Sequence, residues 1–148
     1  MEWPRSVVPP QEAAANASTP RSPVEQEALV QHYRGARSGG KVLIVSRHLD
    51  EAEACAEELR RVGGTAKGHA ADVTKLGDMQ GMADAAAAVH GGIDILCANA
   101  GIFPQTKIED LSSEDWDHVM ATNLKGTFLP IKACLPHLKK SDQGRVVI

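Results

Sequence analysis

The chain has little cysteine, and none of it is arranged as a recognisable site. Its three cysteines, Cys55, Cys97 and Cys134, are widely spaced in 148 residues and form neither a C-x-x-C pair nor a zinc-like grouping with the six histidines. We therefore expect no disulfide framework and no metal site, and a reduced, cytoplasmic setting fits best.

Long apolar runs and blocks of like charge are also missing. No segment approaches the run of about 20 apolar residues that spans a bilayer, and the N-terminus lacks the apolar core of a signal peptide. Lys and Arg total 16 against 19 Asp and Glu, which gives a net charge of −3 without a like-charge run. These absences argue against a membrane segment and against a nucleic-acid partner.

The first 39 residues differ in composition from the rest. Residues 1–21 combine four prolines with Ala, Ser and Asn and show no periodicity, which predicts a disordered tail. Ser22-Pro23-Val24-Glu25 is a good helix start and predicts a short helix at about 23–34. We therefore divide the chain into a tail at 1–39 and one domain at 40–148.

Strands alternate with helices in the domain, which is the pattern of βαβ units on a parallel sheet. Val42-Leu43-Ile44-Val45 is continuously apolar, as a strand buried on both faces must be. The expected order is a strand at 42–45, a helix from 50 to 62, a strand at about 65–71, a helix from 74 to about 90, a strand at 93–98, a helix from 112 or 113 to about 138, and a strand at 144–148. The fold class is therefore α/β.

Polar and small residues follow two of these strands. Ser46 and Arg47 end the first, where an arginine can pair with the 2′-phosphate of NADP, although most such arginines are simply solvated. Asn99-Ala100-Gly101 ends a later strand and can admit a flat ligand or form an ordinary turn. In a doubly wound sheet these strand ends are where ligands bind.

Asn123 is the polar member of an apolar stripe on the long helix. We expect it to be buried, so it is either satisfied structurally or kept for a site. The stripe comprises Trp116, Val119, Met120, Asn123, Thr127, Ile131, Cys134 and Leu135. Pro130 lies inside this helix and should kink it, because it cannot bond the carbonyl of Gly126.

Taken in order, "VLIVSR", "DVT", "DILCANAG" and "MATNLKGTF" resemble the short-chain dehydrogenase/reductase family. The segment from "ANAGIF" to "GRVVI" looks most like the bacterial 3-oxoacyl-acyl-carrier-protein reductases, and the resemblance covers about residues 39–148. It implies a Rossmann-like doubly wound parallel sheet and an oxidoreductase that reduces a 3-oxoacyl thioester or related ketone. Such an enzyme takes a small-molecule carbonyl substrate.

The resemblance also implies roles for individual residues. Ser46 and Arg47 would favour NADP(H) over NAD(H), and Asp72 and Val73 would flank the adenine. Asn99, Ala100 and Gly101 match the family's N-A-G, which lines the cofactor site, and Asn123 matches the helix asparagine whose backbone holds a water of the proton relay. The long helix, 112–138, commonly forms a subunit interface in this family, which implies a homo- or hetero-oligomer.

Two parts of the family pattern have no counterpart. The fingerprint T-G-x-x-x-G-x-G is absent, and Gly35, Gly39 and Gly40 precede a strand that matches the family's second, so they do not form a phosphate loop. We accordingly expect an incomplete sheet that lacks its first strand as well as the C-terminal part of the fold. The Ser–Tyr–Lys group is also missing, since the only tyrosine, Tyr33, lies before the family-like strands.

Three interpretations follow from this pattern. The chain is a truncated or mis-delimited reductase that is inactive in isolation. Alternatively, it is a non-catalytic α/β module that binds a full-length relative through its long helix or its open strand edges. The third interpretation is a non-functional gene remnant.

Overall fold

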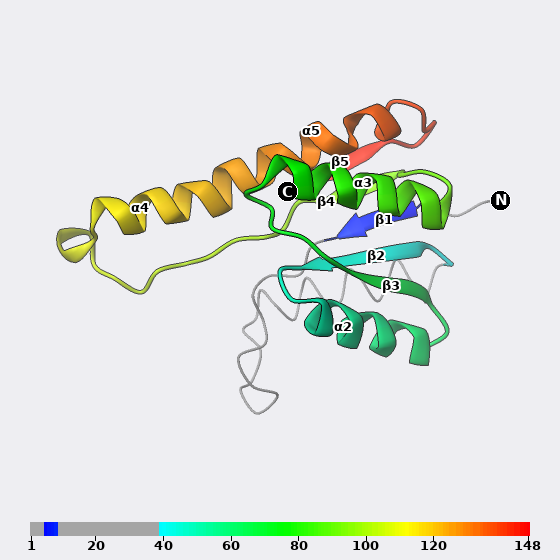
Figure 1. The fold of residues 1–148 in the computed structure, drawn as a ribbon, viewed down its shortest axis with the longest axis horizontal. Helices are drawn as coiled ribbons and strands as arrows, with labels where there is room; N and C mark the ends of the chain where they lie inside the picture. The colour runs from blue at the N-terminus through cyan, green and yellow to red at the C-terminus, as the bar shows by residue number, and fades with distance from the viewer. Residues whose placement is uncertain (1–4, 9–38) are drawn as a thin grey trace.

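The computed structural model describes residues 5–8 and 39–148. They contain a five-stranded sheet with the order β3-β2-β1-β4-β5, in which every neighbouring pair is parallel (Figure 1). The strands are β1 Arg5–Val8, β2 Lys41–Ser46, β3 Thr65–Ala70, β4 Ile95–Cys97 and β5 Arg145–Val147. The expected parallel α/β sheet is confirmed.

The sheet has its first strand, so the expectation that this strand is absent is wrong. β1 lies between β2 and β4, with Arg5 to Val8 in register with Lys41 to Ile44, and Ser6 and Val7 in register with Ile95 and Leu96. Unpaired main-chain groups in the middle of a sheet are costly, and the short run Ser6-Val7-Val8 fills that gap although prolines stand on both sides of it. Within the tail expected at 1–39, residues 5–8 are thus a strand, and the helix expected at about 23–34 lies outside the described residues.

Helices cover both faces of the sheet, as Figure 1 shows. On one face, α2 (Leu49–Arg61) packs on Val42 and Ile44 of β2. On the other face, α3 (Leu76–His90) and α5 (Gly126–Leu138) pack on Leu43 and Val45. Because side chains alternate along a strand, this two-sided cover explains why the whole run at 42–45 is apolar.

The helix ends follow local sequence signals, with small shifts from the expected starts. His48 and Lys75 occupy the N-cap positions in place of Asp50 and Thr74, so the carboxylates of Asp50 and Asp78 lie in the first turns instead. There they interact favourably with the helix dipole. α3 ends at Gly91, whose φ of 83° is the left-handed conformation that glycine adopts most easily.

The long helix expected at 112–138 is present but has an irregular turn. α4 (Ser113–Met120) is capped by Ser112, whose Oγ accepts from the amide of Asp115 at 3.1 Å, and it continues through the π-helical turn η2 (Ala121–Lys125) into α5. A single-turn 3-10 helix, η1 (Ile108–Asp110), precedes it. The hydrogen-bond pattern changes register at residues 121–125, whereas Pro130 lies within α5.

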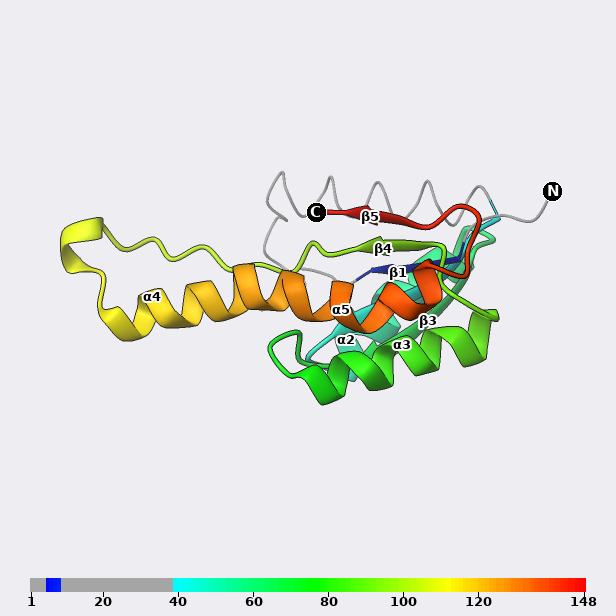
Figure 2. The same cartoon turned by 90° about the horizontal axis from the view of Figure 1, so that it is seen from above.

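Only the C-terminal half of this helix is covered by the sheet. α4 projects past the end of the sheet in both Figure 1 and Figure 2. Large side chains on and around α4 and η2 are exposed: Phe103, Ile108, Trp116 and Leu124. Phe128 and Leu135 of α5 are exposed as well. The buried residues of the helix all belong to α5: Gly126, Leu129, Pro130, Cys134 and Leu138.

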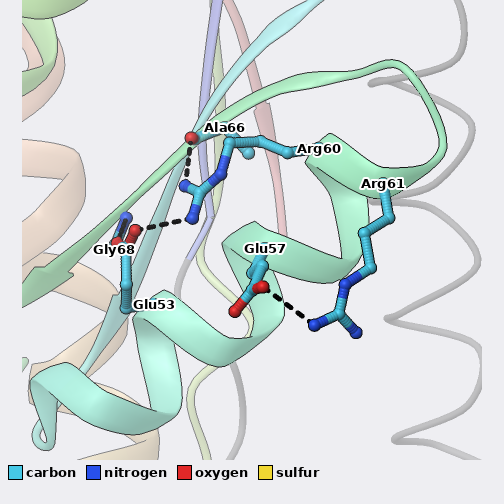
Figure 3. A network of polar contacts seen from close by, with 6 residues as sticks. All are labelled: Glu53, Glu57, Arg60, Arg61, Ala66 and Gly68. Atoms are coloured by element: carbon cyan, nitrogen blue, oxygen red, sulfur yellow. Dashed lines mark hydrogen bonds and ion pairs between the residues drawn. The ribbon is translucent and has the colours of Figure 1, made fainter.

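Two side chains of α2 reach the outer edge of β3, which pairs only with β2 among the strands of residues 5–8 and 39–148 (Figure 3). Since the amide of Ala71 donates to the carbonyl of Ser46, the alternation of the strand directs the main-chain groups of Ala66 and Gly68 outward. Oε2 of Glu53 accepts from the amide of Gly68 at 2.8 Å, and Nη1 of Arg60 donates to the carbonyl of Ala66 at 2.9 Å. Nη2 of Arg60 donates to Oε1 of Glu53 at 2.8 Å, which joins the two caps.

Candidate functional site at the carboxyl ends of the strands

The parallel sheet brings the predicted site residues to the same end of the sheet, at the carboxyl ends of its strands. Ser46 ends β2, Asp72 and Val73 follow β3, and Asn99 follows β4. Carboxyl ends of parallel strands lie on the same side of a sheet, and this is where doubly wound proteins bind their ligands. The sequence-based expectation that these residues share a site is consistent with this topology.

At the end of β2 the Ser46 hydroxyl makes hydrogen bonds to other groups of the protein. Its Oγ donates to Oε2 of Glu51 at 2.8 Å and accepts from the amide of His48 at 3.3 Å. Arg47, beside it, is exposed. Glu51 was not singled out from the sequence; its place as an acid in the first turn of the helix that follows β2 is the signal that could have identified it.

Asp72 forms a tight turn after β3. Its Oδ1 accepts from the Thr74 amide at 2.9 Å and from the Thr74 hydroxyl at 2.7 Å, while Nζ of Lys75 lies 3.4 Å from Oδ2. Partial burial by itself would raise the pKa of Asp72, but these bonds outweigh it and hold the pKa below its usual value. The amide of Asp72 donates in turn to Oδ2 of Asp78 at 2.9 Å, so the carboxylates of Asp72 and Asp78 together fix the shape of the loop.

Val73 fixes the same loop against the long helix. It is 8% exposed and belongs to the core shared by α3 and α5. A Cβ on Gly126 would lie 2.7 Å from Cγ2 of Val73, so the helix approaches the loop at a point where only glycine fits. Val73 thus has a packing role that positions the end of β3.

The residues after β4 include a buried polar atom that has no hydrogen-bond partner in the described part of the chain. Nδ2 of Asn99 is buried and makes no hydrogen bond within residues 5–8 and 39–148. A buried donor left unsatisfied costs about 1–3 kcal/mol, so it is a natural point for a ligand acceptor. Asn99, Ala100 and Gly101 are all half-buried, as residues at a site wall should be.

Asn123 lies beside this loop, but its surroundings differ from the expectation. Its side chain is exposed, because α4 and η2 extend past the sheet, so its expected burial is wrong. Oδ1 accepts from the amide of Ile102 at 2.8 Å, and Nδ2 donates to the carbonyl of Ile102 at 2.9 Å. Its own carbonyl accepts from the Thr127 hydroxyl at 2.7 Å.

The bonds of Asn123 make it a positioning residue for the loop after β4. Gly101 lies against it, since a Cβ at Gly101 would be 3.4 Å from Oδ1 of Asn123. The π-helical turn that carries Asn123 is the kind of helix irregularity that recurs at functional sites. Together these contacts fix the position of Gly101 and Ile102, which follow Asn99 and Ala100 in the loop.

These residues fit the adenosine half of a nicotinamide dinucleotide better than its pyrophosphate half. The unsatisfied donor of Asn99 and the small residues after it suit a flat ring. After β1, by contrast, the sequence continues with Pro9-Pro10 and contains no glycine before Gly35, so the glycines that admit a pyrophosphate are missing from that position.

Comparison with known families decides the class. The family model described as short chain dehydrogenase matches residues 29–148. The chain belongs to the short-chain dehydrogenase family. The resemblance drawn from its motifs is thereby confirmed at family level, together with the Rossmann-like fold.

Relatives in this family carry several different names. The chain is 38% identical over 112 residues to a D-threitol dehydrogenase of Mycolicibacterium smegmatis, covering 76% of this chain and 43% of that protein. It is 37% identical over 99 residues to a D-beta-hydroxybutyrate dehydrogenase of Rhizobium meliloti, covering 66% and 38%. The chain therefore spans less than half the length of these short-chain dehydrogenases.

Solved structures of the family agree with the fold. The crystal structure of a 3-ketoacyl-(acyl-carrier-protein) reductase from Brucella melitensis, complexed with NADH, is 29% identical, with a TM-score of 0.75. The match covers 94% of this chain and 52% of that one. A short-chain type dehydrogenase/reductase from Mycobacterium marinum is 27% identical with a TM-score of 0.77, covering 97% and 53%.

The helices described between residues 39 and 148 carry no membrane-spanning signal. Among the residues that the structure describes, none of them combines the length and the apolar character needed to cross a bilayer.

Proposed function

We propose that the chain supplies the adenosine side of the cofactor site of a short-chain oxidoreductase that acts on a small carbonyl compound or the matching alcohol. The observation that carries this proposal is the buried Asn99 Nδ2, which has no partner in the described part of the chain, on a loop at the carboxyl end of the sheet. The names of the relatives, dehydrogenases of D-threitol and D-beta-hydroxybutyrate, support a hydroxylated or carbonyl substrate. A 3-oxoacyl thioester or related ketone is our specific candidate.

NADP(H) is the proposed cofactor, in preference to NAD(H). The support is Arg47 at the end of β2, where a guanidinium can pair with a 2′-phosphate. When bound, the nicotinamide supplies or accepts the hydride. The chain's own contribution is to hold the adenosine between the ends of β2, β3 and β4.

As an isolated polypeptide the chain is proposed to bind weakly and to turn nothing over. The given sequence has no T-G-x-x-x-G-x-G fingerprint, and Tyr33 is its only tyrosine, so a Ser–Tyr–Lys group cannot be assembled from it. We expect no NADPH oxidation with an acetoacetyl thioester. Any turnover that Asn123→Ala abolishes would show that this part of the proposal is wrong.

Direct titration with NADPH, followed by calorimetry, tests the binding part. Asn99→Ala should weaken binding about three- to tenfold, the usual effect of losing one neutral hydrogen bond. Gln80→Ala, an exposed change on α3, is the matched control and should have no effect. Equal affinities for all three proteins would contradict the assignment of Asn99 to the site.

A second candidate function is favoured by the exposed apolar side chains of the long helix. Trp116, Leu124 and Phe128 are each more than half exposed, on a helix that extends past the sheet. We propose as the alternative that the chain is a non-catalytic module that binds a second copy or a full-length relative through helix 113–138. Light scattering and a pull-down with an intact relative test it, and Leu124→Lys should abolish the association.

A further inference from the structure

Glu51 places a fixed negative charge beside the end of β2. It lies in the first turn of α2, five residues after Ser46, and its Oε2 accepts from the Ser46 hydroxyl at 2.8 Å. The side chain is half-buried, and the hydrogen bond to Ser46 fixes the position of its carboxylate. The amide of His48 donates to the same hydroxyl at 3.3 Å, which orients Ser46 in turn.

This arrangement changes what Ser46 can offer a ligand. A serine hydroxyl has one hydrogen to donate, and here it is directed to Glu51. Ser46 therefore cannot donate to a 2′-phosphate without losing its bond to Glu51. The expectation that Ser46 helps to select NADP(H) is at odds with this geometry.

A carboxylate near the end of this strand also has a direct effect on the ribose. In dinucleotide-binding sheets an acid that follows this strand accepts a hydrogen bond from a free 2′-hydroxyl, whereas a 2′-phosphate is repelled by it. Glu51 brings a carboxylate to the end of the strand from the first turn of α2, through its bond to Ser46. Arg47 has the opposite preference and stands one residue after Ser46. At the end of β2, Arg47 would therefore favour a 2′-phosphate and Glu51 would disfavour it.

We propose that Glu51 is a specificity-determining residue that weakens the binding of 2′-phosphorylated dinucleotides relative to unphosphorylated ones. This inference rests on the proposed cofactor site at this edge of the sheet. The discrimination between NADPH and NADH is thereby assigned to a residue of α2 that is hydrogen-bonded to Ser46 at the end of β2.

The test compares Glu51→Gln with Asp50→Asn, which removes the same charge from the same helical turn. Asp50 is exposed and is the matched control for the general effect of charge. NADPH and NADH are titrated separately into the parent chain and both variants, with affinity measured by calorimetry and folding checked by circular dichroism. Glu51→Gln should raise the ratio of NADPH to NADH affinity about tenfold, the order expected for removing one unit charge a few ångströms away.

Asp50→Asn should change this ratio less than about twofold, because an exposed charge in water acts weakly. Glu51→Ala is a second variant that must shift the ratio in the same direction as Glu51→Gln. If both dinucleotides bind and Glu51→Gln leaves the ratio unchanged, or if Asp50→Asn shifts it equally, the inference is overturned while the cofactor site stands. If neither dinucleotide binds the parent chain, the proposed cofactor site is overturned and the inference with it.

Discussion

The side-chain amide of Asn123 holds the main chain of Ile102 through two hydrogen bonds, one accepted at 2.8 Å and one donated at 2.9 Å. They join residues that are 21 positions apart, so they fix the loop after β4 to the π-helical turn η2. The same loop carries Asn99 and Gly101, which makes Asn123 a support for the candidate cofactor site.

Asn123→Ala should destabilise the fold and loosen this loop. Losing two exposed hydrogen bonds should lower the free energy of unfolding by about 1–2 kcal/mol, measured by urea denaturation. Asn123→Asp keeps the acceptor and loses the donor, so about half of the loss is expected. Lys125→Ala, in the same turn, is the control, and an Asn123→Ala variant as stable as that control would contradict the assigned role.

The cap on the edge of β3 gives a second prediction. Removing both side chains in Glu53→Ala/Arg60→Ala exposes the main-chain groups of Ala66 and Gly68, and exposed strand edges pair with other chains. We expect a stability loss of about 1–2 kcal/mol and association that increases with concentration in light scattering.

Glu57→Ala/Arg61→Ala is the matched control for that variant. These two residues also form an ion pair on α2, at 2.8 Å, and Figure 3 shows it pointing away from β3. An exposed pair of this kind contributes less than about 0.5 kcal/mol. If the two double variants associate equally, the edge cap does not protect the strand.

Acid should destabilise the chain in part through Glu53 and Asp72. The hydrogen bond from the Gly68 amide, followed by that from Arg60, lowers the pKa of Glu53 from its ordinary 4.5. For Asp72, burial acts upward but the bonds from Thr74 and Lys75 prevail and lower the pKa from its ordinary 3.8.

Both groups bind protons more weakly in the folded chain than in the unfolded chain. Their contribution is therefore fully present above the unfolded-state pKa values and is lost as the pH falls through the lower, folded-state values. Urea denaturation from pH 7 downward should show the loss beginning near pH 4.5, and Glu53→Gln should flatten the profile there. A Glu53→Gln profile parallel to that of the parent would contradict the assignment.

Two glycines should respond to alanine in opposite directions. A Cβ at Gly68 would lie 2.6 Å from the main-chain nitrogen of Glu53, so Gly68→Ala must push α2 away from β3 and should cost about 1–3 kcal/mol. At Gly81, inside α3, a Cβ meets nothing within 4 Å, and alanine should stabilise the helix by about 0.5–1 kcal/mol. Melting temperatures that move the same way for both variants would show that the close α2–β3 approach does not limit the fold.

The sequence alone determined the parallel α/β class, most element positions and the family. A continuous apolar strand at 42–45 requires cover on both faces of the sheet. The ordered motifs around Asn99 and Asn123 indicate the family, and they can be read without knowing the tertiary structure. These signals are local or periodic, and the structure confirms the elements they predict.

Only the tertiary structure decided the features that depend on distant partners. The strand at Arg5–Val8 is too short, and too close to prolines, to be predicted from its own sequence. Its pairing with β2 on one side and β4 on the other identifies it. Asn123 is exposed because the long helix extends past the end of the sheet (Figure 1). The periodicity of apolar residues along the helix does not show where the sheet ends. Glu51 became part of the candidate site only when the first turn of α2 brought its carboxylate back to Ser46, since hydrogen bonds between elements depend on how the chain packs.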